Sequence, residues 1–330
     1  MQPIVVFAPA PLLTVTVEAS ETGDEIHVHA GGQGVWVAQM VSVLEAPVTL
    51  CSVFAGETGT VVELLLQQRD MQVRGVASPV RGSAYVHDRR DGERRTVAHM
   101  EPEPLSRHDA DELYGAMLAE GMNASVCVLT GSMSEVVPVD AFRRLAADLR
   151  NNGRIVVADL SGEQLASALD GGLTVLKVAH DELVDAGWTT GDDDASLAQA
   201  MYRLVDAGAE HVVVSRAERG ALLLTDGAFR EIRAPELEAF DHRGAGDSMT
   251  AGIAVGMARG LAVADAVTLG AAAGSVNVTR HGLASGDRET IDAIVPHIEV
   301  RDLSDVTRND APTTARTTPD DLAARARADS

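Results

Sequence analysis

The regular alternation of short apolar strands with helices from Pro104 onward constrains the fold most strongly. Apolar runs at 125–129 and 154–158 are each followed by a segment whose apolar residues recur at helical spacing, at 139–151 and 163–169. A strand that is apolar on both sides belongs to a parallel sheet with helices on both faces. The pattern therefore predicts an α/β fold built on a mainly parallel central sheet.

The first hundred residues contain strands of a second kind. Runs at 4–8 and 48–54 are apolar and resemble buried strands, whereas the strands within about 12–30 and 73–99 alternate apolar and polar residues. Such alternation is typical of a sheet with one exposed face. We expect these segments to form a small separate β-sheet that covers part of a single domain at 1–300.

A glycine-rich turn at 241–252 opens directly into an apolar helical run. Glycine lets a backbone approach a ligand closely, and the unpaired N–H groups at a helix N-terminus favour an anion. Gly244, Ala245 and Gly246 could therefore hold developing negative charge, with Asp247 beside them as a general base. Taken alone, Asp247 is explained as well by the ordinary preference of Asp for a helix start.

Composition excludes several classes of function. A formal net charge of −22 argues against a nucleic-acid or anionic-membrane partner and suits a cytoplasmic protein. Cys51 and Cys127 lie in apolar runs, which predicts buried free thiols, and His27 and His29 lack an evident third metal ligand. The chain has neither a P-loop nor a complete G-x-G-x-x-G, so a Rossmann dehydrogenase is poorly supported.

Two glycine turns far apart in the chain carry a family resemblance. Residues 31–38, GGQGVWVA, resemble the GGKGxNVA signature of the PfkB (ribokinase-like) carbohydrate kinases, and 241–252 resemble that family's DTxGAGDSFxAG signature. The resemblance covers roughly 1–295 and is greatest to the subgroup that contains 1-phosphofructokinase and tagatose-6-phosphate kinase. Intervening segments match in order: 55–59 the GGDTG turn, 129–133 LSGSLP, 157–162 LDTSG, and 214–223 VSLGADGALL.

The resemblance implies a ribokinase-like three-layer sandwich with a small β-sheet lid. It also implies phosphoryl transfer from ATP, with Mg²⁺, to a hydroxyl of a sugar phosphate. Asp247 would take the proton from that hydroxyl, while Gly244, Ala245 and Gly246 would stabilise the transferring group. A homodimer formed through the lid is an option that the resemblance leaves open.

Binding residues are likewise implied by the resemblance, position by position. Glu182 would act on the metal ion through water. The ATP-binding set would be Ser215, Arg216, Ala217, Glu218, Arg219, Gly220, Lys177 and Asn277, and the substrate-binding set Gly31, Gly32, Gln33, Gly34, Arg81 and Asp159.

Departures from the family pattern gather on the acceptor side. Leu12 replaces an Asp expected to hold sugar hydroxyls, Gln33 replaces the Lys of GGKG, and Trp36 replaces an Asn. Ala179 and Ala217 replace an Asn and a Gly elsewhere. Losing a buried polar partner typically costs a few kcal/mol against the original ligand. The segment implied to transfer the phosphoryl group thus matches the family pattern, whereas residues implied to bind the acceptor differ from it.

Two alternatives remain open from the sequence. The chain could be a catalytically impaired regulatory protein that binds a nucleotide or metabolite, or a kinase for a non-phosphorylated sugar or a nucleoside. The last segment, 301–330, is rich in Thr, Ala, Asp and Arg with few large apolar side chains, and we expect it to be a disordered tail.

Overall fold

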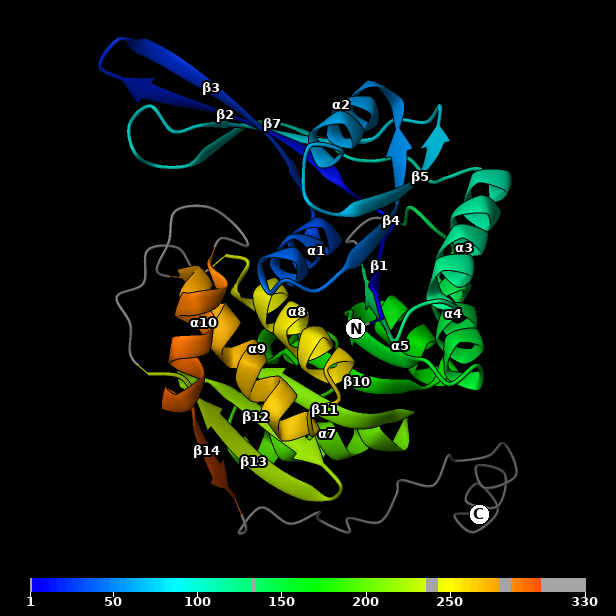
Figure 1. Cartoon of the computed structure of the whole chain (residues 1–330), viewed down its shortest axis with the longest axis vertical. Coiled ribbons are helices and arrows are strands. Elements are labelled where there is room, and N and C mark those ends of the chain that lie inside the picture. Colours follow the sequence, from blue (N-terminus) through cyan, green and yellow to red (C-terminus); the bar gives the residue numbers. More distant parts are fainter. Residues whose placement is uncertain (1, 132–134, 236–242, 279–285, 304–330) are drawn as a thin grey trace, which may run out of the picture.

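A computed structural model describes residues 2–131, 135–235, 243–278 and 286–303. Within these residues ten strands form a central sheet in the order β14-β13-β12-β11-β10-β9-β8-β1-β4-β5 (Figure 1). The strands are β1 Ile4–Ala8, β4 Val48–Ala55, β5 Gln72–Ser78, β8 Val126–Thr130, β9 Ile155–Asp159, β10 Leu173–Ala179, β11 Ala209–Ser215, β12 Ala221–Thr225, β13 Ala228–Arg233 and β14 Glu299–Asp302.

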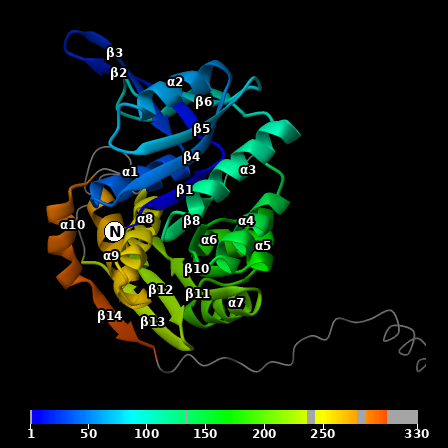
Figure 2. The same cartoon turned by 45° about the vertical axis from the view of Figure 1, so that its right-hand side comes forward.

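Helices cover both faces of this sheet (Figure 2). Side chains of α1, α2 and α8–α10 belong to one buried cluster, and those of α3–α7 to a second cluster across the sheet. The helices are α1 Gln33–Val43, α2 Gly56–Leu66, α3 Arg107–Gly121, α4 Asp140–Asn151, α5 Gly162–Gly171, α6 His180–Asp185, α7 Asp194–Asp206, α8 Ala245–Ala258, α9 Val263–Val278 and α10 Arg288–Ile294.

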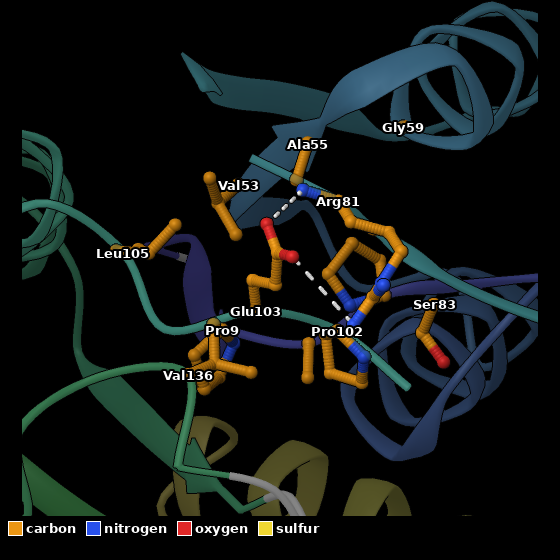
Figure 3. Close-up of a pocket in the computed structure, with 13 residues that line it drawn as sticks. Pro9, Val53, Ala55, Gly59, Arg81, Ser83, Pro102, Glu103, Leu105 and Val136 are labelled. Atoms are coloured by element: carbon orange, nitrogen blue, oxygen red, sulfur yellow. Dashed lines mark hydrogen bonds and ion pairs between the residues drawn. The ribbon is translucent and has the colours of Figure 1, made fainter. Parts of the chain in front are cut away.

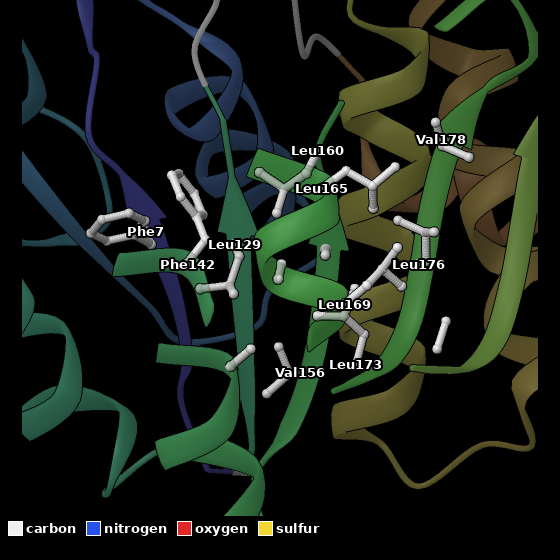
Figure 4. Close-up of a cluster of buried hydrophobic side chains, with 14 of the residues drawn as sticks. Phe7, Leu129, Phe142, Val156, Leu160, Leu165, Leu169, Leu173, Leu176 and Val178 are labelled. Atoms are coloured by element: carbon white, nitrogen blue, oxygen red, sulfur yellow. The ribbon is translucent and has the colours of Figure 1, made fainter. Parts of the chain in front are cut away.

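The central strands are mostly apolar because both of their faces are covered. In β1, Ile4 and Val6 belong to one cluster, while Val5 and Phe7 belong to the other. Phe7 meets Phe142 of α4 edge to face, with ring centroids 5.8 Å apart (Figure 4). The seven strands from β5 to β11 in this order all run parallel. The predicted parallel sheet between two helical layers is therefore confirmed.

Helices α8 and α9 pack together through glycines. A Cβ added to Gly252 would lie 2.6 Å from the Cα of Gly270, so neither backbone could come this close with a larger residue. Farther along the same pair of helices, a Cβ on Gly256 would lie 2.6 Å from the Cα of Ala266. This contact fixes the axis of α8 against the core, and with it the glycine turn at the start of α8.

The four strands of the lid are β2 Leu12–Ser20, β3 Gly23–Gly31, β6 Ser83–Asp88 and β7 Arg95–Met100, in the order β3-β2-β6-β7. The separate small sheet expected from the alternating pattern is confirmed for these strands. Strand β2 pairs antiparallel with β3 and parallel with β6. The β2–β3 hairpin extends away from the body of the molecule (Figure 1).

One part of the expected lid was wrong. The segment at 73–76 lies in β5, which pairs in parallel with β4 at the edge of the central sheet, with Thr49 opposite Gln72 and Ala55 opposite Ser78. Its alternating pattern has another cause. An edge strand that packs on one face shows the same alternation of apolar and polar residues as a lid strand, because both have one side exposed to solvent.

The C-terminal boundary also needs correction. Arg301 and Asp302 belong to β14, where they lie opposite Glu231 and Arg230 of β13, rather than to a tail. The rest of the expected tail, 304–330, lies outside the described residues, as do Asp241 and His242. Both cysteines are free and buried, as predicted. No helix in the described parts is long and apolar enough to cross a membrane.

Candidate functional site

A cavity of about 360 Å³ lies between the lid and the carboxyl ends of the central strands. Open α/β sheets bind their ligands at this end of the strands. The lid contributes Leu12, Ser83, Tyr85 and His99 to its wall, and the body of the molecule contributes Gln33, Trp36, Asp159, Gln164, Glu182 and Asp247.

The glycine turn before α8 leads into Asp247, which lines the cavity; Gly244, Ala245 and Gly246 are not among the lining residues. Gly244 is the N-cap residue and has a left-handed backbone with φ 76°, a conformation that favours glycine. Asn277 of α9, itself buried, donates a hydrogen bond from Nδ2 to the carbonyl oxygen of Arg243 at 2.7 Å. Helix α9 therefore stabilises the turn. The unpaired N–H groups of the first turn of α8 lie at the same end of the helix as Asp247.

A buried ion pair lies directly beside this turn. Lys177 of β10 places Nζ 3.3 and 3.2 Å from Oδ1 and Oδ2 of Asp159, and both residues are at most 5% exposed. Thr250 of α8 donates its hydroxyl hydrogen to Asp159 Oδ2 at 2.7 Å. A Cβ on Gly246 would lie only 2.8 Å from Lys177 Nζ. The ammonium group thus lies against the helix start, and a larger residue at 246 would have to displace it.

Charges around Asp247 shift its proton affinity. Burial raises the pKa of Asp247 to about 7, helped by the negative charges of Asp159 and Glu182 and opposed by Lys177. Burial works against the charge of Lys177, but Asp159, Asp247 and Glu182 outweigh it and raise the pKa of the ammonium group. The site therefore pairs a permanent cation with a carboxylate that can exchange a proton near neutral pH.

Glu182 faces the same cavity from α6. Burial is the main cause that raises the pKa of Glu182, although the backbone N–H of Ala179 donates to its Oε2 at 2.9 Å. Among the described residues no cluster of three or more His, Cys, Asp or Glu side chains could hold a metal ion. A magnesium ion carried by phosphates needs only one or two protein carboxylates, since phosphate oxygens and waters complete its shell, so Glu182 fits that kind of site.

The opposite wall of the cavity is aromatic and apolar. Tyr85 and His99 are cross-strand neighbours in the lid, and their rings stack with centroids 4.1 Å apart. Leu12 and Trp36 complete this wall. The sequence had marked Leu12 and Trp36 as departures from the family pattern, and they do line the cavity. Segment 81–85, which ends at Tyr85, also departs from a family pattern, R-I-N-V-K, but nothing in the sequence singled out His99 or predicted that the two rings meet, because this contact depends on the register of β6 and β7.

Gln33 links the wall to the body of the molecule. It is the first residue of α1, and its Oε1 accepts a hydrogen bond from the backbone N–H of Gly131 at 3.1 Å. Gly32 precedes it with φ 106° and also lines the cavity. Gly31 and Gly34 do not line it. A Cβ on Gly34 would lie 2.5 Å from the Cβ of Ala8, so its role in the structure is close packing.

Arg81 lies in a smaller neighbouring pocket at the base of the lid (Figure 3). Its Nε donates to the carbonyl oxygen of Glu101 at 3.0 Å, and its Nη2 lies 3.6 Å from Oε1 of Glu103. The backbone N–H of Glu103 in turn donates to the carbonyl oxygen of Arg81 at 2.9 Å. Arg81 thus joins the two chain segments that lead into and out of the lid hairpin, outside the large cavity.

The segment from Ser215 to Gly220 begins at the carboxyl end of β11, beside β10. Ser215 is the register partner of Ala179, two residues after Lys177. Residues Ala217–Arg219 form a 3-10 turn whose side chains are exposed, whereas Arg216 is 3% exposed. The segment therefore lies one strand from the buried ion pair, with Arg216 turned inward.

Comparisons with known proteins agree with this architecture. The model of the pfkB family carbohydrate kinases matches residues 6–291. The 1-phosphofructokinase of Bacillus subtilis is 27% identical over 281 residues, which cover 83% of this chain and 89% of that protein. The ATP-dependent 6-phosphofructokinase isozyme 2 of Mycobacterium tuberculosis is 30% identical over 301 residues, or 86% of each chain.

A solved structure supports the fold. Phosphofructokinase-2 from Escherichia coli, in complex with potassium, matches with a TM-score of 0.80 at 24% identity and covers 90% of this chain and 99% of that one. At this level of identity the likeness concerns the fold alone. It confirms the three-layer sandwich with a small lid that the sequence predicted.

Proposed function

The chain belongs to the pfkB family of carbohydrate kinases, and we propose that it transfers the γ-phosphoryl group of ATP to a hydroxyl group of a sugar phosphate with Asp247 as general base. Because it belongs to this family, the protein is a phosphotransferase with an alcohol group as acceptor. One observation carries the proposed mechanism. Asp247 lies at the N-terminus of α8, lines the cavity and is close to the buried Lys177. The pKa of the Asp247 carboxyl group is raised to about 7.

Asp247 accepts the proton of the acceptor hydroxyl as that oxygen attacks the γ-phosphorus. The bond between the γ-phosphorus and the β,γ-bridging oxygen breaks, and ADP leaves with the electron pair. A carboxylate with a pKa near 7 is a better proton acceptor than an exposed Asp and is still largely ionised slightly above neutral pH. Proton transfer to a positioned base typically contributes about 10²–10⁴-fold in rate.

Two fixed groups would stabilise the negative charge of the phosphoryl group during its transfer. The backbone N–H groups of Ala245 and Gly246 lie at the positive end of α8, and Lys177 Nζ lies against Gly246. Because Asp159 pairs with Lys177 and is itself held by the hydroxyl group of Thr250, the ammonium group needs little rearrangement during the reaction. Mg²⁺ bound to the ATP phosphates would supply further charge neutralisation, with Glu182 contacting it through water.

A sugar phosphate is the acceptor that the named relatives favour, since both are phosphofructokinases. The wall formed by Leu12, Trp36, Tyr85 and His99 supports a second candidate, a non-phosphorylated sugar or nucleoside. Aromatic faces stack on sugar rings and bases alike, while the carboxylates and amides opposite them can bind hydroxyl groups. A catalytically impaired binding protein is disfavoured by the intact arrangement of Asp247, Lys177 and the helix start.

The test is a coupled assay of ADP release with a panel of acceptors. The panel contains fructose 1-phosphate, fructose 6-phosphate and tagatose 6-phosphate, together with the parent sugars and common nucleosides. We expect turnover with a sugar phosphate that exceeds turnover with its parent sugar. Turnover confined to a parent sugar or nucleoside selects the second candidate, and ATP binding without turnover on any acceptor supports a binding protein.

We also propose that the chain forms a homodimer through the outer face of its lid. Val17 lies opposite Ile26, and Val15 opposite Val28, so the four side chains share one face of the sheet. Ile26 is 67% exposed and Val28 39%. An apolar face of this kind on a projecting hairpin is typical of an interface. The molar mass in solution tests it: Ile26→Glu should yield monomers, whereas Leu261→Glu, at an exposed site outside the lid, should not.

A further inference from the structure

The segment Ser215–Gly220 departs from the family pattern VSLGADGALL at four consecutive positions, 216–219, of which the first two bear on the backbone of the turn. Arg216 stands in place of the Leu, and Ala217 in place of the first Gly. Ala217 has φ 49°, the left-handed region in which a side chain is unfavourable by one to two kcal/mol, which corresponds to a population penalty of roughly tenfold. Some other contact must hold this turn in place.

Arg216 supplies that contact from both its backbone and its side chain. Its backbone N–H donates to the carbonyl oxygen of Gly220 at 2.8 Å, and its Nη2 donates to the carbonyl oxygen of Arg219 at 3.0 Å. The same residue thus joins the start of the turn to its end. Ala217 lies between the residues that these hydrogen bonds join, so the bonds stabilise its left-handed backbone conformation.

The guanidinium group is anchored to two other elements. Nη2 donates to Oε1 of Glu231 on β13 at 2.9 Å, and Nη1 contacts Oδ1 of Asp194 at the start of α7. Figures 1 and 2 show β11, β12 and β13 side by side, with α7 alongside. Arg216 is 3% exposed and Glu231 5%. The turn is therefore tied to the sheet and to a helix through a buried charge pair.

Glu231 stays ionised in this setting. Burial alone would raise its pKa, but hydrogen bonds from Arg233 and Arg216 outweigh burial and hold the pKa below its usual range. Arg233 donates to the same Oε1 at 2.9 Å. Glu231 consequently keeps one cationic partner when Arg216 is replaced, and such a variant should still fold.

We infer that Arg216 is a positioning residue that holds Ala217 in its left-handed turn and thereby shapes the nucleotide-binding segment, without contacting the nucleotide itself. The inference rests on the proposed function for its consequence in ATP binding, but the closure of the turn is a property of the fold. In this turn Arg216 compensates for the side chain that Ala217 brings into a position suited to glycine.

The test uses Arg216→Leu, Ala217→Gly and the double variant, which restores the family residues at both positions. Two quantities are measured: amide hydrogen exchange of Arg219 and Gly220, and the Kd for ATP in the presence of Mg²⁺ by calorimetry. Arg230→Leu is the matched control. It removes an arginine from β13 that pairs with Asp302.

We expect Arg216→Leu to speed exchange of the two amides and to weaken ATP binding about tenfold. Ala217→Gly alone should change Kd less than about twofold, and the double variant should recover most of the lost affinity. Thermal stability should fall in both variants that lack Arg216, because the ion pair is gone in each. Recovery of Kd without recovery of stability separates positioning from a general structural role.

Equal losses of affinity in Arg216→Leu and in the double variant would overturn the inference, as would unchanged exchange in Arg216→Leu. A wild-type protein that does not bind ATP would instead contradict the proposed function. In that case the exchange rates, which need no nucleotide, still decide whether Arg216 holds the turn.

Discussion

The two sides of the cavity differ in how firmly their polar groups are held. On the α8 side, Lys177 and Asp159 are buried, paired and hydrogen-bonded, and Gly246 leaves room for one arrangement only. On the lid side, Tyr85 and His99 stack on one another and remain partly open to solvent. Side chains on the first side cannot be exchanged without leaving a buried charge unpaired, whereas those on the second can.

This contrast explains where the chain departs from its family. A buried charge network loses several kcal/mol when one member is removed, so its members are retained together. A cavity wall formed by partly exposed side chains tolerates Leu12 or Trp36 in place of a polar residue, and only the ligand changes. We propose that the α8 side carries out the reaction and that the opposite wall, formed by the lid and by Trp36 of α1, selects the acceptor. The predictions below test that division.

The largest effect is expected for Asp247→Asn. The amide has the same shape but cannot accept the proton, so kcat should fall by about 10³-fold or more while the Kd for ATP changes little. Steady-state kinetics with the acceptor found in the panel measure it. Asp265→Asn, at the exposed start of α9, is the matched control and should keep full activity. Activity retained in Asp247→Asn would remove the general base from the mechanism.

A somewhat smaller effect is expected for Gly246→Ala. The added Cβ would stand 2.8 Å from Lys177 Nζ, which cannot move freely because Asp159 holds it. We expect kcat to fall by about 10²-fold through displacement of the ammonium group. Gly115→Ala in α3, where an added Cβ meets no atom within 4 Å, serves as control. Equal activity of the two variants would show that the α8 side is not rigid.

Trp36→Asn tests the wall opposite α8, to which α1 contributes this side chain beside the lid. Removal of the indole takes away part of the wall that faces the acceptor, so the KM for the acceptor should rise about tenfold. The KM for ATP, measured in the same assay, should stay within about twofold and is the internal control. A parallel rise in both constants would contradict the division of the cavity into a reaction side and an acceptor side.

The smallest effect concerns pH. Asp247 acts as a base only when ionised, and its pKa is raised to about 7, so kcat should rise with pH through about 7 and level off above it. Each unit of pH below the midpoint should lower the rate about tenfold.

A variant sharpens the pH test. Because Glu182 contributes to the raised pKa of Asp247, Glu182→Gln should move the midpoint to lower pH, whatever its effect on the absolute rate. A rate that is constant between pH 5 and 8 would show that proton transfer to Asp247 does not limit turnover.

Much of the central fold was predictable from the sequence. A strand that is apolar at every position, such as β1, is stable only in a sheet that is covered on both faces. The order of helices and strands along the chain then limits the topology. The lid hairpins were predictable from alternation and turn residues. The segment at 73–76 was not, since one solvated face is common to a lid strand and to an edge strand such as β5.

The site was predictable only in part, and for a comparable reason. Backbone-determined features, such as the glycine turn before Asp247, leave a local pattern in the sequence. Contacts between side chains from separate elements do not. The pairing of Lys177 with Asp159, the stack of Tyr85 on His99 and the bond from Asn277 to Arg243 each join residues distant in the chain. Their meeting depends on strand register and helix packing.

The sequence by itself determined the α/β class, the strand–helix order, the glycine turn before α8 and the family to which they point, because each depends on residues close together in the chain. Tertiary structure alone decided that Arg81 joins the base of the lid rather than lining the cavity, and that Arg216 faces inward to hold Ala217. It also set the proton affinity of Asp247, because burial and the charges of Asp159, Glu182 and Lys177 act through space and not along the chain.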